Sequence, residues 1–426
     1  MLLQAGMLLP IHTQAAGLSD QALSERLNAA AALGSSLTPF GAERAGAETT
    51  GANSADWQQL PPWRGGLSFP PADFNGHLIN PYRAEAPLAL LTASSPESQL
   101  QWLGTGLRLW LQYHPEQTIR VYASHRTATA PFRILDQAYR NRVRLEPSPQ
   151  GGFLYGHGAI PYPQPERGEQ IIWNHLLAWR GTQDDYGLLE RQRQNGEASV
   201  PWLWQVSEQW PWQQDVEHCG HACEGEQGHY SARLQSLMQR QWQLVQPQQG
   251  APLIWKQQLY MQAGRPILDA SIAGSWPVSD QTRMLGSAEV GLYSELPRDY
   301  LWSLLGKRML LVPYNQYPSQ DVVETMQGGE GVMDWQQLRF ELHRVWVVDG
   351  VLRKNADNQY RKRVYYVDED SWQIVMADLY GHDGSLQRVG LQFLYSDYRI
   401  PAMRTALQGI LNVRNDDASW LLRTSW

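Results

Sequence analysis

The sequence lacks the features that would place it in several large protein classes. It has no basic excess, since 35 Lys and Arg stand against 42 Asp and Glu, for a formal charge of −7. A nucleic-acid-binding protein normally carries a basic surface, so we expect no nucleic-acid partner. No run of about twenty apolar residues occurs, so we expect no membrane-spanning helix. No Walker motif or dinucleotide-binding glycine pattern joins a strand to a helix, and we predict no cofactor.

Phenylalanine is also scarce, whereas the other two large aromatic residues are abundant. The chain has 7 Phe against 19 Trp and 19 Tyr. Trp and Tyr each combine a large apolar body with one polar group, so they suit half-hydrated cavities and interfaces. The alternative interpretation is that these side chains fill the core of a β protein.

The strongest pattern in the chain is a series of β-rich runs near its C-terminal end. The runs Leu338–Val348 and Tyr360–Val367 are followed by the turn Asp368–Trp372 and a further apolar run to Tyr380. Short polar turns between such runs predict an antiparallel meander. Large side chains fall on both alternating positions, which fits a curved sheet that lines a cavity on one side. A sandwich with both faces covered fits equally well.

The remaining sequence predicts the order of segments along the chain. Residues 1–16 read as a clipped signal peptide, because an apolar stretch precedes small residues without a basic start. Residues 17–66 are expected to form an N-terminal helix, from Ser19 to Leu33 with Ser19 or Asp20 as its N-cap, and an extended arm. Residues 67–426 are expected to form a single β-rich domain with an irregular insertion at about 183–255. Apolar spacing predicts further helices over Pro96–His114 and Glu169–Arg180.

The only two cysteines lie in one compact cluster with histidines. The candidate metal ligands are His218, Cys219, His221, Cys223 and His229. Thiolates and imidazoles at this spacing can hold zinc, although zinc modules usually place a ligand pair on each side of a loop. A Cys219–Cys223 disulfide is the alternative for an exported protein, and free thiols are a third.

Two further groups of polar residues have chemical potential. Asp368, Glu369 and Asp370 resemble a cation-binding loop, but their spacing differs from an EF-hand, so we predict a solvated hairpin turn. Ser371, His343 and Asp378 could be nominated as a catalytic set. No Gly-x-Ser-x-Gly turn presents a hydroxyl, and a histidine within a strand is more often structural. We therefore predict no catalytic residue and no enzyme.

Six segments, in order along the chain, resemble a known family. They are Leu37–Gly46, Trp63–Leu67, Trp173–Gly181, Val312–Tyr317, Glu341–Val348 and Asp368–Trp372. Together they resemble the domain of unknown function 1329 family, whose members are exported proteins of Gram-negative bacteria labelled as outer-membrane lipoprotein-sorting-like. The segment around the cysteines departs from the usual middle of that family.

This resemblance implies a fold, a location and partners. The fold would be a mainly β (α+β) one, with a large curved antiparallel sheet or half-open barrel similar to the Lol lipoprotein carriers, and helices from the N-terminal half packed on it. The location would be the periplasm, with association to the outer membrane as a further expectation. The implied partners are an outer-membrane barrel-like protein and an exporter of the resistance-nodulation-division type.

Three functions are compatible with these observations. The first is a periplasmic carrier for a hydrophobic ligand, such as a lipid or a lipoprotein acyl chain. The second is a structural adaptor of an envelope export complex, and the third is a hydrolase acting on an apolar envelope substrate. A carrier predicts a cavity lined by aromatic residues, and an adaptor predicts a filled barrel with an exposed apolar patch. The predicted ligand-binding residues are Trp173, His175, Tyr314, Asn315, His343, Trp346, Tyr366 and Trp372.

Overall fold

The structure is a computed structural model that describes residues 19–48, 56–214, 234–247, 253–273, 285–328 and 333–424. The predicted signal peptide over residues 1–16 lies outside these ranges. So do both cysteines and the three histidines of the compact cluster. The zinc, disulfide and free-thiol alternatives for that cluster therefore stay open.

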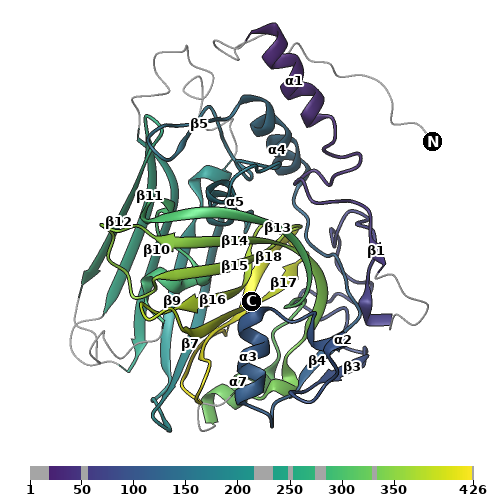
Figure 1. The fold of residues 1–426 in the computed structure, drawn as a ribbon, viewed down its shortest axis with the longest axis vertical. Coiled ribbons are helices and arrows are strands. Elements are labelled where there is room, and N and C mark those ends of the chain that lie inside the picture. The colour runs from purple at the N-terminus through teal and green to yellow at the C-terminus, as the bar shows by residue number, and fades with distance from the viewer. Residues whose placement is uncertain are drawn as a thin grey trace.

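A single mixed sheet of 15 strands dominates the fold (Figure 1). Its strands run in the order β12-β11-β10-β9-β7-β19-β18-β17-β16-β15-β14-β4-β3, with β13 paired to β14 and β8 to β7. The pairs are antiparallel except β4 with β14. Strand β12 at one end and strand β3 at the other do not pair, so the sheet is open. The predicted mainly β fold with a large curved sheet is confirmed.

The strands of this sheet have the following bounds: β3 Ala89–Leu91, β4 Ile119–Tyr122, β7 Gln183–Gln194, β8 Glu197–Ala198, β9 Trp202–Gln209, β10 Leu234–Gln246, β11 Ile254–Gln262, β12 Arg265–Ala273, β13 Tyr300–Pro313, β14 Phe340–Leu352, β15 Lys362–Asp368, β16 Ile374–Tyr380, β17 Leu386–Asp397, β18 Ala402–Asn412 and β19 Ala418–Arg423. Two small ribbons add β1 Ala47–Glu48 with β2 Gln59–Leu60 and β5 Glu146–Pro147 with β6 Phe153–Leu154. The three β-rich runs predicted from the sequence correspond to β14, β15 and β16.

The sheet consists of two parts joined by one strand. Strands β7, β9, β10, β11 and β12 form a part that we call the wall, and β13–β18 form the meander. Strand β19 pairs with β18 on one side and with β7 on the other. The last strand in chain order among those described therefore joins the middle of the chain to its C-terminal half.

The prediction of an irregular insertion at about 183–255 was wrong for the described part of that segment. Those residues form β7, β9 and β10 of the wall. In β9, Trp202, Trp204 and Val206 are buried while the residues between them are more exposed. This period of two is that of a strand with one face in the core. Glutamine at the outward positions obscured the pattern.

The helices are α1 Asp20–Ala30, α2 Glu97–Leu100, α3 Thr105–Tyr113, α4 Phe132–Arg144, α5 Gly168–Leu176 and α7 Gln320–Gly328, with short 3-10 turns at η1 Asp56–Gln58, η2 Pro211–Gln213, η5 Ser287–Leu292, η6 Pro297–Asp299 and η7 Trp335–Gln337. The Ser19 hydroxyl accepts a hydrogen bond from the Ala22 amide and caps α1, as predicted. The run Pro96–His114 forms two helices, α2 and α3. Helix α5 ends at Leu176, and Gly181 beyond it adopts a left-handed φ of 104°. Helix α4 was not predicted.

No helix in the described ranges has the length and apolar content needed to cross a membrane.

Apolar cores lie on both faces of the meander. One core combines α5 residues such as Ile172 with wall tryptophans and with Tyr365 of β15. Since the wall and the meander both contribute to this core, the sheet bends around it, and we call this side the concave face. The other core packs Leu107 of α3 and Met326 of α7 against the meander. Figure 1 places α4 and α5 towards one end of the molecule and α3 and α7 towards the other. Both faces of the meander are thus covered by apolar cores.

Candidate functional site

The predicted ligand-binding residues separate into several places. Tyr314, Asn315 and His343 meet in one buried polar cluster. The Tyr314 ring stacks on the His343 ring with centroids 3.9 Å apart. The Asn315 amide donates to both oxygens of Glu341, at 3.1 and 3.0 Å. Asn315 adopts a left-handed φ of 52°, which turns the chain out of β13 so that its side chain reaches this cluster.

His343 lies between two carboxylates in the centre of this cluster. Its Nε2 is 3.3 Å from Oε2 of Glu341, and its Nδ1 is 3.6 Å from Oδ1 of Asp368. Burial by itself lowers the pKa of His343, but the hydrogen bonds and charges of Asp368 and Glu341 outweigh it and raise the pKa to about 9. Burial favours the neutral form of Glu341, yet Arg339 and His343 lower its pKa to about 2. The cluster therefore holds an imidazolium between carboxylates at neutral pH.

The turn at 368–371 is buried, and the prediction of a solvated hairpin turn was wrong. Asp368, Glu369 and Asp370 are 0%, 1% and 4% exposed. Arg126 donates to both oxygens of Asp370 at 2.7 Å, and it also donates to the carbonyl of Glu43 at 2.7 Å. The guanidinium thereby ties the N-terminal arm to the turn. Bidentate pairing of this kind satisfies charges that would otherwise be costly to bury.

Two residues of this turn and one residue of β14 form a group, among the described residues, whose side chains could hold a metal ion. His343, Asp368 and Asp370 each offer one ligand atom, and these atoms lie within 4.8 Å of one another. Asp368 Oδ1 has no hydrogen-bond partner. However, Arg126 occupies both oxygens of Asp370, and the imidazole carries a proton at neutral pH. The donor set fits an ion cluster balanced by the protein's own cations better than it fits a metal.

The nominated catalytic residues do not form a catalytic set. The Ser371 hydroxyl donates to Asp368 Oδ2 at 2.6 Å rather than facing His343 as a nucleophile. Asp378 lies elsewhere, where it accepts hydrogen bonds from the Tyr366 hydroxyl and the Gly106 amide at 2.8 and 3.0 Å. A hydrolase that depends on these three residues is not supported.

The other predicted residues are distributed around the two cores. Trp346 stacks on Trp372 with ring centroids 6.2 Å apart, and Trp372 donates to the Phe40 carbonyl. Trp173 donates to the Gly151 carbonyl at 3.2 Å. Tyr366 lines a cavity of about 240 Å³ beside the α2–α3 connection. Each of these side chains has a clear structural role in the fold.

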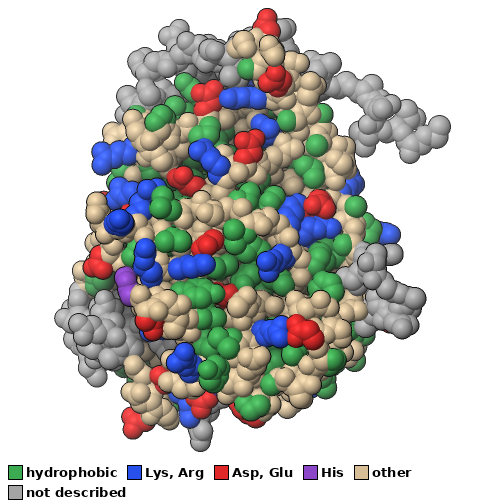
Figure 2. All heavy atoms as spheres, in the orientation of Figure 1, with side chains coloured by type: hydrophobic (Ala, Val, Ile, Leu, Met, Phe, Trp, Pro, Cys, Tyr) green, Lys and Arg blue, Asp and Glu red, His purple; other side chains and the backbone are tan. Residues whose placement is uncertain are grey.

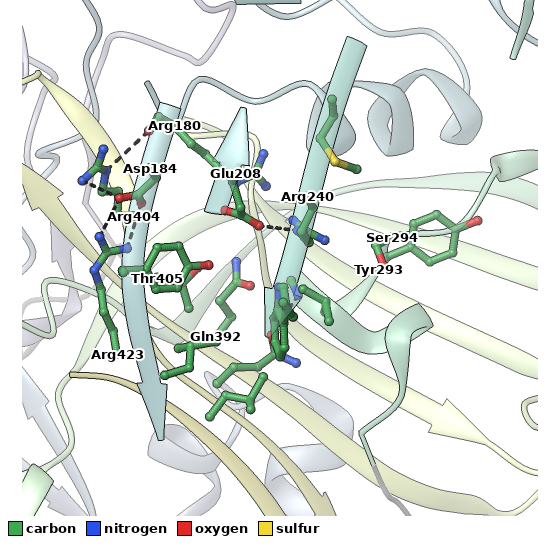
Figure 3. A pocket seen from close by; sticks show the side chains of 18 of the residues that line it. Arg180, Asp184, Glu208, Arg240, Tyr293, Ser294, Gln392, Arg404, Thr405 and Arg423 are labelled. Atoms are coloured by element: carbon green, nitrogen blue, oxygen red, sulfur yellow. Dashed lines mark hydrogen bonds and ion pairs between the residues drawn. The ribbon is translucent and has the colours of Figure 1, made fainter. Parts of the chain in front are cut away.

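His175 is the predicted residue that lines a cavity on the concave face. This cavity has a volume of about 80 Å³. Its apolar lining residues include Leu176, Leu188, Met238, Trp242, Val290 and Leu421, and its polar ones include Arg180, Asp184, Tyr186, Glu208, Arg240, Arg404, Thr405 and Arg423. In Figure 3, Arg404 and Arg423 converge on Asp184, while Glu208 lies beside Arg240. The lining thus combines apolar and charged side chains.

A short segment covers part of this concave face. Residues 285–293, which we call the cover segment, include Val290, Gly291 and Tyr293 of the cavity lining. His175 anchors the segment, because its Nε2 lies 3.2 Å from the Tyr293 carbonyl while its Nδ1 accepts from the Ile374 amide. This arrangement fixes a neutral imidazole, and burial holds the pKa of His175 well below its usual value.

Comparison with known proteins identifies the family. The family model of DUF1329, described as a protein of unknown function, matches residues 92–236 and 270–422. The chain belongs to the DUF1329 family. The resemblance noted in the sequence is therefore confirmed.

Relatives of this DUF1329 chain include one curated protein and several solved structures. An uncharacterized protein of Pseudomonas aeruginosa is 30% identical over 392 residues, which cover 87% of this chain and 82% of that protein. A DUF1329 family protein from Desulfovibrio piger matches with a TM-score of 0.33 and 8% identity, over 57% of this chain and 84% of that one. A LolA superfamily protein from Nitrosomonas europaea matches with a TM-score of 0.33 and 12% identity, over 61% and 93%.

The charged residues of the concave cavity in this DUF1329 protein were missed by sequence reasoning. Arg180, Arg404 and Arg423 come from the connection between α5 and β7, from β18 and from β19, so no motif unites them.

Proposed function

We propose that this DUF1329 protein is a periplasmic carrier that binds a hydrophobic, amphipathic molecule on the concave face of its sheet. The observation that carries the proposal is the cavity there, whose lining combines apolar side chains with charged ones. Binding sites for such molecules are concave and mostly apolar, with a few placed polar groups. The periplasmic location and the partner proteins rest on the family resemblance described above.

In this proposal the described arrangement is the closed form of the carrier. The cavity of about 80 Å³ is smaller than the roughly 300–1,000 Å³ of sites that enclose small molecules. A chain of ten or more carbons therefore requires more room. The cover segment is the element whose displacement would provide it, because its apolar side chains occupy the concave face.

The cover segment has two properties suited to displacement. Leu292 is 2% exposed and packs so closely on β17 that a Cβ at Gly390 would lie 2.7 Å from its Cδ2. Its φ of 66° is strained for a residue of this size. Leu285, Val290 and Tyr293 also pack in the core, and Gln408 accepts from the Gly291 amide and donates to the Glu289 carbonyl at 2.8 and 2.6 Å. An apolar ligand chain could take the place of Leu292.

Native mass spectrometry of protein taken from the periplasm tests the proposal, because it reads the bound mass directly. We expect an extractable lipid or other apolar molecule. After delipidation, a nitroxide-labelled stearic acid should quench the fluorescence of Trp210 and Trp242, which line the cavity. Protein that carries no lipid and shows no quenching by this probe would count decisively against a carrier.

A matched pair of variants relates binding to the cover segment. We expect Leu292→Ala to bind the labelled stearic acid several-fold more tightly, because the truncation opens space beside the cavity. Leu391→Ala is the control, since Leu391 is equally buried in the opposite core. Both truncations should cost about 2–5 kcal/mol of stability. Equal changes in affinity in the two variants would mean that the ligand does not enter beside Leu292.

A structural adaptor is the second candidate function, and two observations favour it. The protein's own segments fill most of the concave face, as an adaptor with a filled sheet predicts. Leu301 and Leu305 are 52% and 57% exposed on β13, a strand whose only strand partner among the described residues is β14. Figure 2 shows apolar side chains among basic ones over the middle of the face where Figure 1 draws β13–β15. The lipid measurement separates the two functions, because this adaptor retains no lipid.

A further inference from the structure

We infer that the polar end of the carried molecule is an oxyanion, a carboxylate or a phosphate, and that Arg180 on the concave face binds it. This inference rests on the proposed carrier function and specifies the ligand that the cavity selects. Four arginines line the cavity, and Arg180 is the one with no carboxylate of the described residues within ion-pairing distance.

The charges that line the cavity do not balance. Four arginines and two carboxylates contribute to the lining, and 4 − 2 gives a formal charge of +2. His175 adds no charge, because its Nδ1 accepts a hydrogen bond from a backbone amide. The surplus lies in a partly enclosed space where water screens charges poorly. A carboxylate would offset half of this surplus, and a phosphate up to all of it.

Three of the four arginines have carboxylate partners. Arg423 binds Asp184 through both terminal nitrogens, at 2.8 and 2.7 Å. Arg404 lies 3.1 Å from the same carboxylate and 3.2 Å from Asp397. Arg240 pairs with Glu208. These pairs fix both carboxylates of the lining and leave neither for the fourth arginine.

Arg180 is that fourth arginine. Its terminal nitrogens donate to the carbonyls of Ala178 and His175, at 3.3 and 3.1 Å, and no carboxylate of the described residues lies within ion-pairing distance. A guanidinium has five N–H donors, so these two bonds leave three available. Burial lowers the pKa of Arg180 to about 10, while the charge of Glu208 opposes this effect and the charge of Arg240 adds to it. Glu208 itself pairs with Arg240, so Arg180 has no direct carboxylate partner among the described residues.

The surroundings of Arg180 fit an oxyanion in size and in donors. A volume of about 80 Å³ holds several water-sized groups, which is enough for a carboxylate or phosphate but not for a chain. The hydroxyls of Tyr186 and Thr405 also line the cavity, and neither has a partner in the part of the chain that the structure describes. Both can donate to an anion. The same cavity is also lined by Leu176 and Trp242 and by Val290 of the cover segment, which offer apolar contacts to the rest of the ligand.

The test compares ligands that share one chain and differ in the polar group. Dodecanoate, dodecyl phosphate and dodecanol are titrated below their micelle concentrations, and binding is measured by native mass spectrometry and tryptophan fluorescence. We expect at least one anion to bind about ten- to a hundredfold more tightly than dodecanol, the range for one charge-assisted hydrogen-bonding group. Comparison of the two anions distinguishes a carboxylate from a phosphate ligand.

Variants then assign the effect to Arg180. Arg180→Met should reduce the preference for the anion over dodecanol to within about threefold, while Arg180→Lys should keep part of it, because an ammonium retains the charge but loses the planar donors. Arg414→Met is the matched control, since Arg414 is exposed on a turn far from the cavity lining. If Arg180→Met fails to fold, the wild-type ligand comparison and Arg180→Lys still decide the question.

The outcomes separate this inference from the carrier function. Binding of dodecanol as tight as that of both anions, with no change in Arg180→Lys, would overturn the inference and leave the carrier intact. Binding of none of the three ligands, or of any labelled fatty acid, would overturn both. Anion preference that persists in Arg180→Met would place the anion elsewhere and also refute the assignment.

Discussion

Replacement of His343 by glutamine should remove a pH-dependent part of the protein's stability. In the folded protein the pKa of His343 is raised to about 9 from an ordinary value of 6.5. The imidazolium is fully buried between Glu341 and Asp368, so solvent does not screen these interactions. At about 1.4 kcal/mol per pKa unit, the difference corresponds to about 3 kcal/mol of unfolding free energy.

The sign of this effect follows from the direction of the pKa change. A raised pKa means that the folded state binds the proton more tightly than the unfolded state. The stabilisation is therefore complete below pH 6.5 and is lost as the pH rises through 9. Glutamine has no titratable proton, so the His343→Gln variant lacks this dependence while it keeps a polar group of similar length.

Urea unfolding of the two proteins at a series of pH values from 6 to 9.5 measures the effect. We expect the unfolding free energy of the native protein to exceed that of His343→Gln by about 3 kcal/mol at pH 6, and we expect this excess to shrink at each higher pH. If the difference in unfolding free energy stays constant from pH 6 to pH 9.5, His343 is not an imidazolium held between carboxylates. A marked stabilisation by added divalent metal at high pH would instead support a metal held by the turn.

Three other substitutions test separate features. Arg126→Met should cost about 3–5 kcal/mol in urea unfolding, because it leaves buried carboxylates without their partner, whereas Arg414→Met should change stability by less than about 0.5 kcal/mol. Asp378→Asn should stabilise the protein by up to about 3 kcal/mol at pH 7 and by nothing near pH 3.5, since burial raises the pKa of Asp378 to about 6 and its charge is unfavourable above that pH. Gly41→Ala should release the N-terminal arm to limited proteolysis, because a Cβ there would lie 1.7 Å from the Pro163 carbonyl oxygen and the φ of 88° disfavours alanine.

The sequence predicted the meander and the capped N-terminal helix because both depend on local patterns. Alternating apolar residues mark β14 and β15 directly, and Ser19 precedes a helical run. Helix α4 was missed because its buried face includes the small Ala138 and the polar Asn141, whose amide donates to two loop carbonyls. Only Ile134 and Val143 are large apolar residues among the four that this face buries, so its helical spacing is easily overlooked among the polar residues around it.

The candidate site was less accessible to sequence reasoning, because its properties depend on distant partners. Three adjacent acids read as a solvated turn, and their burial depends on Arg126, which lies more than 240 residues earlier in the chain. Arg180 reads as an ordinary residue before a glycine. Its lack of a carboxylate partner follows from the arginines on β18 and β19, which occupy Asp184. Spacing along one sequence does not encode such a competition.

The position of β19 has a consequence for the order in which the molecule assembles during synthesis. Strand β7 leaves one long edge unpaired until residues 418–423 have emerged from the ribosome, whereas β18 precedes β19 by only five residues. An unpaired edge of this kind can join to other chains, so the edge of β7 is exposed to aggregation while residues 195–417 are synthesised. A chaperone that holds the chain unfolded until β19 pairs with β7 and β18 would protect the edge of β7.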